Sequence, residues 1–279
     1  MPDTILRGPY AQAQADYTMP QPVYSAAEHA TWRALATRQA ALLPDHAAQA
    51  YRDGLAALGG DGGVPDFTAA STRLAGGWRL VGVPGLIPER DFFTHLAERR
   101  FPVTTWIRRW DELDYIVEPD IFHDFQGHVP LLTQPDFAEF LAAYGAAGRD
   151  AAAEHLPALA RLYWHAVEFG LIRKTEGLRD RETEGLRDRE SAGLRAYGAG
   201  ILSSAAETLH ATQGPATRLR FDLARVLRSD YEIDHLQPLY FVIESYAALF
   251  DALAELHAAL AALGPPIPAG ATTPADIPA

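Results

Sequence analysis

The sequence of 279 residues contains no cysteine. This absence excludes disulfide bonds, thiolate metal sites and cysteine nucleophiles, so a transition-metal site must be built from histidine and carboxylate ligands. No uncharged apolar stretch approaches the roughly 18 residues that a membrane-spanning helix requires, and we expect no contact with a membrane. The N-terminus lacks a basic segment followed by an apolar run. We therefore expect no signal peptide and a cytoplasmic location.

Basic residues are scarce relative to acidic ones. Lys and Arg number 24 against 36 Asp and Glu, so the formal net charge is −12. Binding to a phosphate backbone requires a basic face, and we therefore expect no nucleic-acid partner. Hydrophobic residues make up 48% and charged residues 22%, a balance typical of a globular protein with a sizeable core. We expect a monomer, because the Pro-rich C-terminal segment shows no heptad pattern.

Helices dominate the predicted elements. Residues 1–24 carry several Pro, Gln and Tyr without a clear period, which indicates an extended arm. Ser25 and Glu28 have the spacing of a capping box, which predicts that a helix begins at this point. Further helices are expected in residues 46–58, 66–75, 89–99, within 119–172 and, as a last long helix, in 242–262.

Strand signals are few and scattered. Residues 101–107 are rich in β-branched and aromatic side chains and form the best candidate strand, and residues 78–83 form a second. The Pro-, Ala- and Thr-containing segment 264–279 is expected to be disordered. The expected fold class is therefore mainly α with a small β element, as a single compact domain of residues 25–263.

An eight-residue sequence occurs twice in tandem. Residues 175–182 and 183–190 both read TEGLRDRE, and residues 191–198 are a partial third copy. A period of eight is shorter than the roughly 20–50 residues of solenoid repeats. We interpret residues 175–190 as a duplicated insert in a solvated surface loop, and a lid or docking segment is the alternative.

Two histidines lie five residues apart in the segment EPDIFHDFQGHVP, residues 118–130. On an ideal α-helix this spacing separates His123 from His128 by about 140° of rotation. Both rings can share a target only if the helix ends or bends between them, and Gly127 and Pro130 are residue types that end helices. The pair is therefore either structural, near a helix end, or a pair of metal ligands.

A carboxylate lies in the apolar segment LYWHAVEFGLI, residues 162–172, where Glu168 is the only formal charge. Its spacing from Trp164 and Leu171 places it on an apolar stripe. A buried carboxylate usually has a cation or a metal as its partner, and an ion pair with Arg173 would serve. Two histidines and one carboxylate are also the ligand set of non-haem Fe(II) oxygenases, which favours a metal site.

Both segments resemble signature motifs of the pterin-dependent aromatic amino acid hydroxylases. The motifs are HDFQGHVP at residues 123–130, preceded by Glu-Pro-Asp, and YWHAVEFG at residues 163–170. The similarity continues through YGAGILSS at residues 197–204 and QPLYFVIES at residues 237–245, and it covers most of the chain. Within this family the chain most resembles the short bacterial phenylalanine hydroxylases.

The resemblance implies a catalytic domain that hydroxylates L-phenylalanine to L-tyrosine with dioxygen, in phenylalanine catabolism. It implies that His123, His128 and Glu168 bind Fe(II) and form the catalytic centre. A tetrahydropterin, such as tetrahydrobiopterin, would be the cosubstrate. The resemblance assigns to the pterin Phe92, Gly85, Leu86 and Asp124. It assigns to the amino acid substrate Arg108, Trp164, Phe169, Gly200 and Ser203.

Two of these assignments have ordinary alternatives. By residue type alone, Phe92 is a core aromatic. The guanidinium of Arg108 matches a substrate carboxylate bidentately, but it could equally pair with Asp111 or Asp120. Asp120 could also orient Arg108 toward the substrate.

The chain departs from the family pattern in two places. Ile116 stands where the animal enzymes have a threonine that helps to hold the amino acid backbone. Glu168 and Tyr197 are 29 residues apart, and the excess of 16 over the family spacing equals the two TEGLRDRE copies. Because a displacement of about 1 Å can lower a rate by ~100-fold, the insert could reduce activity.

The sequence leaves alternatives to phenylalanine hydroxylation open. One is a tyrosine or tryptophan hydroxylase of the same family, since pocket size separates these activities. Another is a non-catalytic metal-binding protein whose insert docks a partner. A hydrolytic zinc site is the third, although no separate general base is evident beside Glu168.

Overall fold

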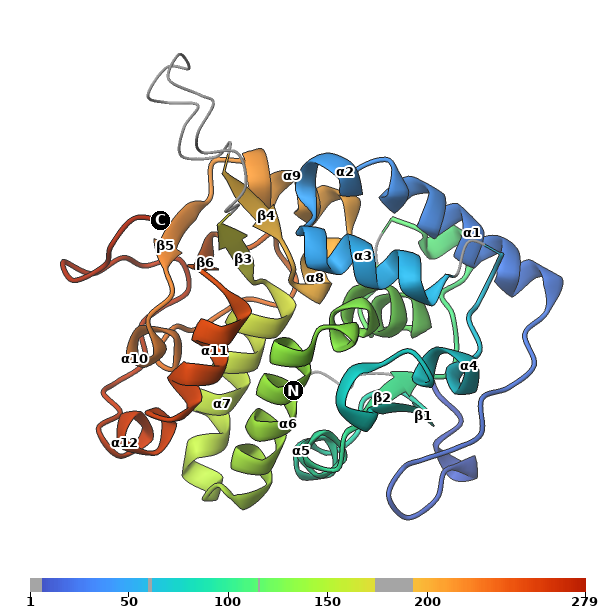
Figure 1. Cartoon of the computed structure of the whole chain (residues 1–279), viewed down its shortest axis with the longest axis horizontal. Coiled ribbons are helices and arrows are strands. Elements are labelled where there is room, and N and C mark those ends of the chain that lie inside the picture. The colour runs from blue at the N-terminus through green and yellow to red at the C-terminus, as the bar shows by residue number, and fades with distance from the viewer. Residues whose placement is uncertain (1–6, 60–61, 115, 174–192) are drawn as a thin grey trace. The chain divides into compact units, whose positions relative to one another are not determined.

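The computed structural model describes residues 7–59, 62–114, 116–173 and 193–279 (Figure 1). The duplicated insert therefore lies outside the described residues. Internal contacts divide the chain into two compact units. The first unit comprises Met1–Ala41 and Asp53–Ala151, and the second comprises Leu42–Arg52 and Ala152–Ala279.

The first unit begins with an extended segment that leads into a capped helix. The segment contains the 3₁₀ turn Tyr10–Gln12. Helix α1, Ala26–Ala40, begins at the predicted capping box, where the Ser25 side chain accepts a hydrogen bond from the Glu28 backbone N–H. The Glu28 carboxylate in turn accepts one from the Ser25 N–H at 2.7 Å. This reciprocal pairing satisfies two N–H groups that the first helical turn leaves free.

The remainder of the first unit combines helices with a two-stranded parallel sheet. Its helices are α4 (Phe67–Ser71), α5 (Glu89–Ala97) and α6 (Pro135–Asp150), and its strands are β1 (Arg79–Val83) and β2 (Arg100–Thr104). Helix α3 (Gln49–Leu58) contains the boundary between the two units. Both predicted strands are present, but β2 ends before residue 107. The ladder stops at the pair Val83–Thr104 because Pro84 has no N–H with which to continue it.

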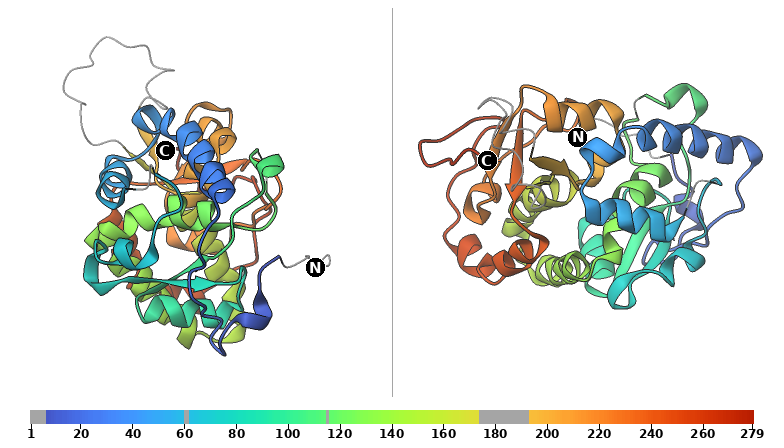
Figure 2. Two further views of the ribbon diagram at one scale, coloured as in Figure 1. Left: turned by 90° about the vertical axis from the view of Figure 1, so that its right-hand side faces the viewer. Right: turned by 45° about the horizontal axis from the view of Figure 1, so that its top comes forward.

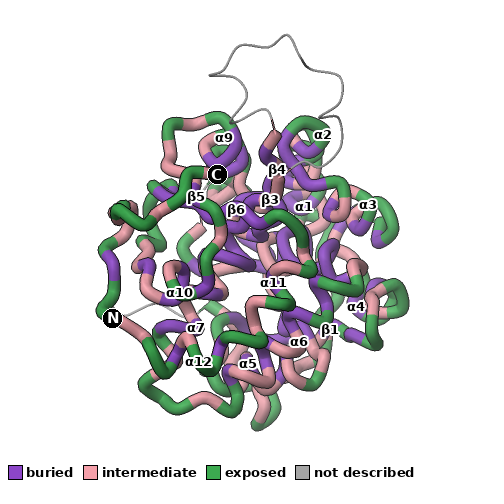
Figure 3. The backbone as a smooth tube through the Cα atoms, turned by 60° about the vertical axis from the view of Figure 1, so that its left-hand side comes forward, coloured by how far each residue is buried: buried purple, intermediate pink, exposed green. Residues whose placement is uncertain are grey.

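The second unit contains a four-stranded mixed sheet in the order β4-β3-β6-β5. The strands are β3 (Leu171–Arg173), β4 (Leu194–Ala196), β5 (Thr217–Arg220) and β6 (Leu239–Ile243). Strand β4 is antiparallel to β3, whereas β6 is parallel to both of its neighbours. All five residues of β6 are buried, and Figure 3 shows this buried centre in purple along β3 and β6. The core of the second unit therefore lies along β6.

Short helices make up most of the remainder of the second unit. They are α2 (Leu43–His46), α7 (Leu156–Tyr163), α8 (Ala199–Leu202), α9 (Ala205–Gln213), α10 (Leu223–Val226), α11 (Tyr246–Leu253) and α12 (Leu256–Ala261). The fold is thus mainly α with a small β element, as predicted. None of the helices in the described part of the chain is long and apolar enough to cross a membrane.

The predicted long helix over residues 242–262 is wrong. Its beginning is strand β6, and the remainder is divided into α11 and α12. Ser245 ends the strand and caps α11 by accepting a hydrogen bond from the Ala248 N–H at 3.2 Å. A strand buried on both faces shows no alternation of polar and apolar residues, so its sequence resembles that of a buried helix.

The expected disorder of residues 264–279 is also wrong. Ile267 is buried and exchanges backbone hydrogen bonds with residues that follow α10, where its carbonyl accepts from the Asp230 N–H at 2.8 Å. Pro278 forms a bridge with Leu219 of β5, and Figure 2 shows the dark red C-terminal segment returning to the orange strand. The carboxylate of Asp276 pairs with the half-buried Arg225 at 2.7 Å. These contacts join residues distant in sequence, so local composition could not reveal them.

Candidate metal and substrate site

The two predicted histidine ligands lie in a π-helix, Phe122–His128. The hydrogen bonds of a π-helix join residues five apart, which brings side chains at this spacing to the same side. The ring centroids of His123 and His128 are 5.2 Å apart at an interplanar angle of 80°. Their candidate ligand nitrogens lie within 4.8 Å of each other. The wider turn of the π-helix therefore places both imidazoles on the same side, whereas we had expected a helix end or bend to do so.

Aromatic packing holds this π-helix in the first unit. The rings of Phe122 and Phe125 contact the buried indole of Trp32 edge-on, with centroid distances of 5.2 and 5.9 Å. The ring of His128 lies 5.1 Å from that of Phe101 on β2 and is buried, whereas His123 is only half-buried. The apolar side of the segment therefore anchors it and leaves one imidazole partly accessible.

Arg108 forms a buried ion pair with Asp120. Its Nε and Nη2 donate to the two carboxylate oxygens at 2.8 Å each, and the side chains are 6% and 0% exposed. The same carboxylate accepts from the backbone N–H groups of Arg108 and His123 at 2.9 and 3.0 Å. Asp111 instead pairs with Arg109 on the surface. Asp120 therefore holds both the predicted substrate arginine and the beginning of the histidine segment.

The predicted pterin loop follows strand β1. Gly85 has φ +152°, and a Cβ there would lie 2.8 Å from the Tyr10 hydroxyl, so a side chain would be strained and crowded. Tyr10 donates a hydrogen bond to the carbonyl of Leu86 at 3.0 Å. Burial and the nearby Glu118 raise the pKa of Tyr10 to about 12, so it remains a donor at neutral pH. Tyr10 was missed in the sequence, where the arm has no periodic pattern.

Phe92 and Asp124 lie on other elements of the same unit. Phe92 is half-buried on α5, whereas its neighbour Phe93 is 2% exposed and packs against Tyr144 of α6. The core position therefore belongs to Phe93. The Asp124 carboxylate accepts a hydrogen bond from the Thr104 N–H at 2.7 Å. Desolvation raises the pKa of this carboxyl group, because burial disfavours its charged form.

Glu168, the predicted third ligand, ends a second π-helix, Trp164–Glu168, in the second unit. The Phe169 N–H continues the wide turn by donating to the Trp164 carbonyl, five residues earlier, at 2.9 Å. Glu168 is 9% exposed. The guanidinium of Arg173, which we considered as its partner, lies 3.5 Å from Glu244.

The residues predicted to contact the substrate ring gather in the second unit. The rings of Trp164 and Phe169 have centroids 4.7 Å apart. A Cβ at Gly200 would lie 2.7 Å from the Phe169 ring, so only glycine allows α8 to approach this closely. Ser203 is half-buried immediately after α8. The structure thus brings Trp164, Phe169 and Gly200 together.

Two further residues that contact Trp164 had no role in the sequence prediction. The Tyr231 ring stacks on the indole with a centroid distance of 4.3 Å and an angle of 13°. Gln237 Oε1 accepts a hydrogen bond from the indole Nε1–H at 2.9 Å. Gln237 belongs to the QPLYFVIES motif, so its position was noted in the sequence but its contact was not.

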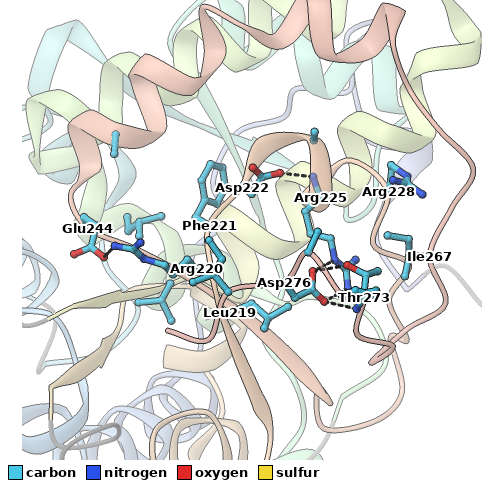
Figure 4. A pocket seen from close by; sticks show the side chains of 17 residues that line it. Leu219, Arg220, Phe221, Asp222, Arg225, Arg228, Glu244, Ile267, Thr273 and Asp276 are labelled. Carbon is cyan, nitrogen blue, oxygen red and sulfur yellow. Dashed lines mark hydrogen bonds and ion pairs between the residues drawn. The ribbon is translucent and has the colours of Figure 1, made fainter.

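The second unit also contains a pocket of about 720 Å³. Figure 4 shows it between β5, α10 and the C-terminal segment, with the ion pair of Arg225 and Asp276 on one side. Arg220 and Glu244 lie at its other side. None of the residues predicted to bind iron, pterin or substrate lines this pocket. We therefore do not include it in the candidate site.

Comparison with known proteins identifies relatives along nearly the whole chain. A family model described as biopterin-dependent aromatic amino acid hydroxylase matches residues 9–262. Phenylalanine-4-hydroxylase from Ralstonia nicotianae is 50% identical over 244 residues, which cover 85% of this chain and 73% of that protein. The enzyme of the same name from Chromobacterium violaceum is 49% identical over 246 residues, with 86% and 77% covered.

Solved structures agree with these sequence matches. The crystal structure of Chromobacterium violaceum phenylalanine hydroxylase with bound iron(III) and oxidised cofactor 7,8-dihydrobiopterin has a TM-score of 0.85 at 47% identity. It covers 95% of this chain and 94% of that one. Because the family match includes residues of both units, the two units together correspond to one catalytic domain of this type.

Proposed function

Because the chain belongs to the biopterin-dependent aromatic amino acid hydroxylases, we propose that it hydroxylates L-phenylalanine to L-tyrosine with iron, a tetrahydropterin and dioxygen. One observation carries this proposal: the family match over residues 9–262 includes every residue assigned to iron, pterin and substrate. The names of the bacterial relatives support phenylalanine as the substrate. We place the reaction in phenylalanine catabolism, in the cytoplasm, with the enzyme as a monomer.

His123, His128 and Glu168 would hold the iron. The donor set fits this metal: imidazole nitrogens suit Fe(II), and a carboxylate completes the 2-His-1-carboxylate set, which leaves positions open for other ligands. Two features of this chain support the assignment. The two imidazoles project from one side of a π-helix, and Glu168 as a residue is only 9% exposed. When bound, iron and the reduced pterin supply the activation of dioxygen that protein side chains cannot perform.

The pterin would lie against the loop after β1. Gly85, where any side chain would be strained, fixes the path of this loop, and Tyr10 holds it through a hydrogen bond to the Leu86 carbonyl. Phe92 offers a partly exposed aromatic ring, on which a planar heterocycle can stack. Asp124 is fixed by β2 through its hydrogen bond with Thr104 and offers its other oxygen to the cosubstrate.

The two ends of the amino acid would be bound by different groups. Arg108 would bind the substrate carboxylate through Nη1. Asp120 occupies the other two nitrogens of the guanidinium, Nε and Nη2, whereas Nη1 makes no hydrogen bond to the described residues. The rings of Trp164 and Phe169 would bind the phenyl ring and exclude water from it. Gly200, which has no side chain, lets α8 pack directly against the ring of Phe169.

Product analysis on three amino acids tests the proposal. The protein is loaded with Fe(II) without oxygen and then mixed with a tetrahydropterin and air, together with L-phenylalanine, L-tyrosine or L-tryptophan. We expect tyrosine from phenylalanine by mass spectrometry and none from a His123→Ala variant. Preferred hydroxylation of tyrosine or tryptophan would reassign the substrate. Stoichiometric iron without any product would favour a non-catalytic metal-binding protein, and failure to bind iron would overturn the metal site.

A further inference from the structure

The indole of Trp164 is held on more than one side within the second unit. One face stacks on Tyr231 at 4.3 Å, and the ring of Phe169 lies 4.7 Å away. The indole edge donates its Nε1–H to Gln237 Oε1 at 2.9 Å. Stacking alone would let the indole slide across its neighbours as its side-chain torsions change, whereas a hydrogen bond at one edge fixes its position. Gln237 is thus the group that sets the angle of the indole.

Gln237 is itself rigidly placed. It is 2% exposed, although residues 232–236 and Pro238 on either side of it are exposed. Its Nε2 donates to the carbonyls of Glu232 and His235 at 2.7 and 3.1 Å. If the amide were turned over, its NH₂ group would face the indole N–H and its oxygen would face two carbonyls. Only one orientation of the amide satisfies all these groups, and in that orientation the oxygen points to Trp164.

Both polar groups of the Gln237 backbone, the N–H and the carbonyl, contact side chains of helix α9. Its N–H donates to the buried carboxylate of Glu207 at 3.2 Å, and its carbonyl contacts Nε2 of His210 at 3.1 Å. The hydroxyl of Tyr240 on β6 donates to the same Glu207 oxygen. The position of the amide is therefore defined by α9 and β6 rather than by the exposed loop around it.

We propose that Gln237 is a positioning and specificity-determining residue for the amino acid ring. By fixing the indole of Trp164 against Tyr231 and Phe169, it sets the position of the indole and thereby the room that is left for the ring of the amino acid. This inference rests on the proposed function, in which Trp164 contacts the substrate ring. It assigns Gln237 a role through Trp164 and not a contact with the reacting atoms.

Three substitutions separate the indole contact from the other contacts of Gln237. Gln237→Leu removes both the acceptor for Trp164 and the donors to the loop carbonyls. Gln237→Glu keeps an oxygen toward the indole but replaces the donating NH₂ group, so it tests the loop contacts. The matched control is Gln213→Leu, at the exposed end of α9, which changes the same residue type outside this network.

The first readout is independent of turnover. In ¹⁵N-labelled protein the Nε1–H signal of Trp164 is assigned by its absence from a Trp164→Phe variant, and its exchange with solvent is measured. We expect Gln237→Leu to accelerate this exchange about tenfold, the effect of one lost hydrogen bond. Gln213→Leu should retain the wild-type rate. Gln237→Glu, whose second oxygen would face the carbonyls of Glu232 and His235, should give a rate between those of the wild type and Gln237→Leu. Unchanged exchange in Gln237→Leu would overturn the positioning role, even if the protein proved to have a different activity.

The second readout is the ratio of kcat/KM for L-phenylalanine to that for L-tryptophan. We expect Gln237→Leu to lower this ratio about tenfold, and to have no further effect in a Trp164→Phe background because the two residues act as one unit. Accelerated indole exchange with an unchanged ratio would overturn the specificity role. Absence of any hydroxylation by the wild-type protein would instead contradict the proposed function, and the exchange measurement would still test the geometry.

Discussion

Arg108 in the first unit and Trp164 in the second are both fixed by a buried partner, but through different forces. Arg108 is held by a bidentate ion pair with Asp120, in which both side chains are nearly free of solvent. Trp164 is held by one neutral amide and by ring stacking. Removing one member of a buried charged pair lowers stability strongly, because it leaves an uncompensated buried charge. Removing one neutral contact lowers stability less, because the other contacts of the ring remain.

This difference matches the two ends of the proposed substrate. The charged end of an amino acid is the same in every candidate, and a rigid ion pair can be used to recognise it. The ring differs between phenylalanine, tyrosine and tryptophan, and neutral packing can be adjusted to each by small changes. We therefore expect substitutions around Arg108 to weaken folding or substrate binding strongly, and those around Trp164 to change substrate preference.

The largest effect is expected from Asp120→Ala. It leaves Arg108 buried without its counter-ion and removes the acceptor of the His123 N–H, so unfolding free energy should fall by about 3–5 kcal/mol. Urea denaturation measures this change. Asp111→Ala, which breaks an exposed pair with Arg109, is the control and should leave the midpoint nearly unchanged. Equal effects of the two variants would contradict the distinction between buried and exposed pairs.

Lowering the pH should destabilise the second unit through His165. Burial, helped by Arg225 and Arg161, lowers the pKa of His165 to about 4, although the hydrogen bond to the Ser229 carbonyl and the nearby Asp230 act in the opposite direction. Between about pH 6.5 and pH 4 the unfolded chain takes up a proton that the folded chain does not. Stability should therefore fall as pH falls through this window, by on the order of 3 kcal/mol, and His165 should add no further slope below it.

His165→Gln checks this expectation, because the glutamine amide nitrogen can take the place of Nε2 and donate to the Ser229 carbonyl but does not titrate. Unfolding free energies of the variant and the wild type are compared from pH 7 to pH 4. The wild type should lose more stability than the variant across this range. Parallel curves would show that His165 is not the titrating group.

A smaller effect is expected from Arg108→Lys. The lysine keeps a positive charge beside Asp120 but loses the planar fork, so KM for L-phenylalanine should rise roughly 10- to 100-fold. The KM for the tetrahydropterin should change less than about twofold, since the pterin residues are untouched. Initial-rate kinetics with each substrate varied in turn measures both values. A parallel rise in the two would indicate a general disturbance of the site instead of a lost carboxylate contact.

The smallest effect is expected from deleting residues 175–190. Arg173 pairs with Leu194 across β3 and β4, so the ends of the intervening segment are adjacent in the fold. The deletion shortens this connection from 20 residues to 4, a length common in β-hairpins. We expect kcat/KM to change less than about threefold. A large loss of activity would show that the duplication contributes to the site, and the loss of a binding partner alone would favour a docking role.

Local sequence rules predicted the elements that local contacts stabilise. The capping box at Ser25 and Glu28 is present, and the strand signals near residues 79 and 101 were correct. Strand β6 was misread as the beginning of a helix because burial on both faces removes its alternation. The C-terminal segment was misjudged because Asp276 and Pro278 are fixed by residues far away in sequence.

The candidate site could be predicted only in part. The residue types at positions 123, 128 and 168 suggested a metal, but the ideal period of 3.6 residues places the two histidines on different sides of a helix. The π-helix that brings them together packs against Trp32, a contact between distant residues that periodicity does not reveal. The roles of Phe92 and Gly85 came from the family resemblance. Tyr231 and Gln237 emerged only from three-dimensional contacts.

The most direct test of the proposed reaction traces the oxygen atom in the product. Iron-loaded protein is given L-phenylalanine and a tetrahydropterin under ¹⁸O₂ in ordinary water, and tyrosine is analysed by mass spectrometry. A monooxygenase of this family should yield tyrosine heavier by two mass units, with one labelled oxygen. Tyrosine that carries oxygen from water, or no tyrosine from protein with stoichiometric iron, would contradict the assignment of this chain as a phenylalanine hydroxylase.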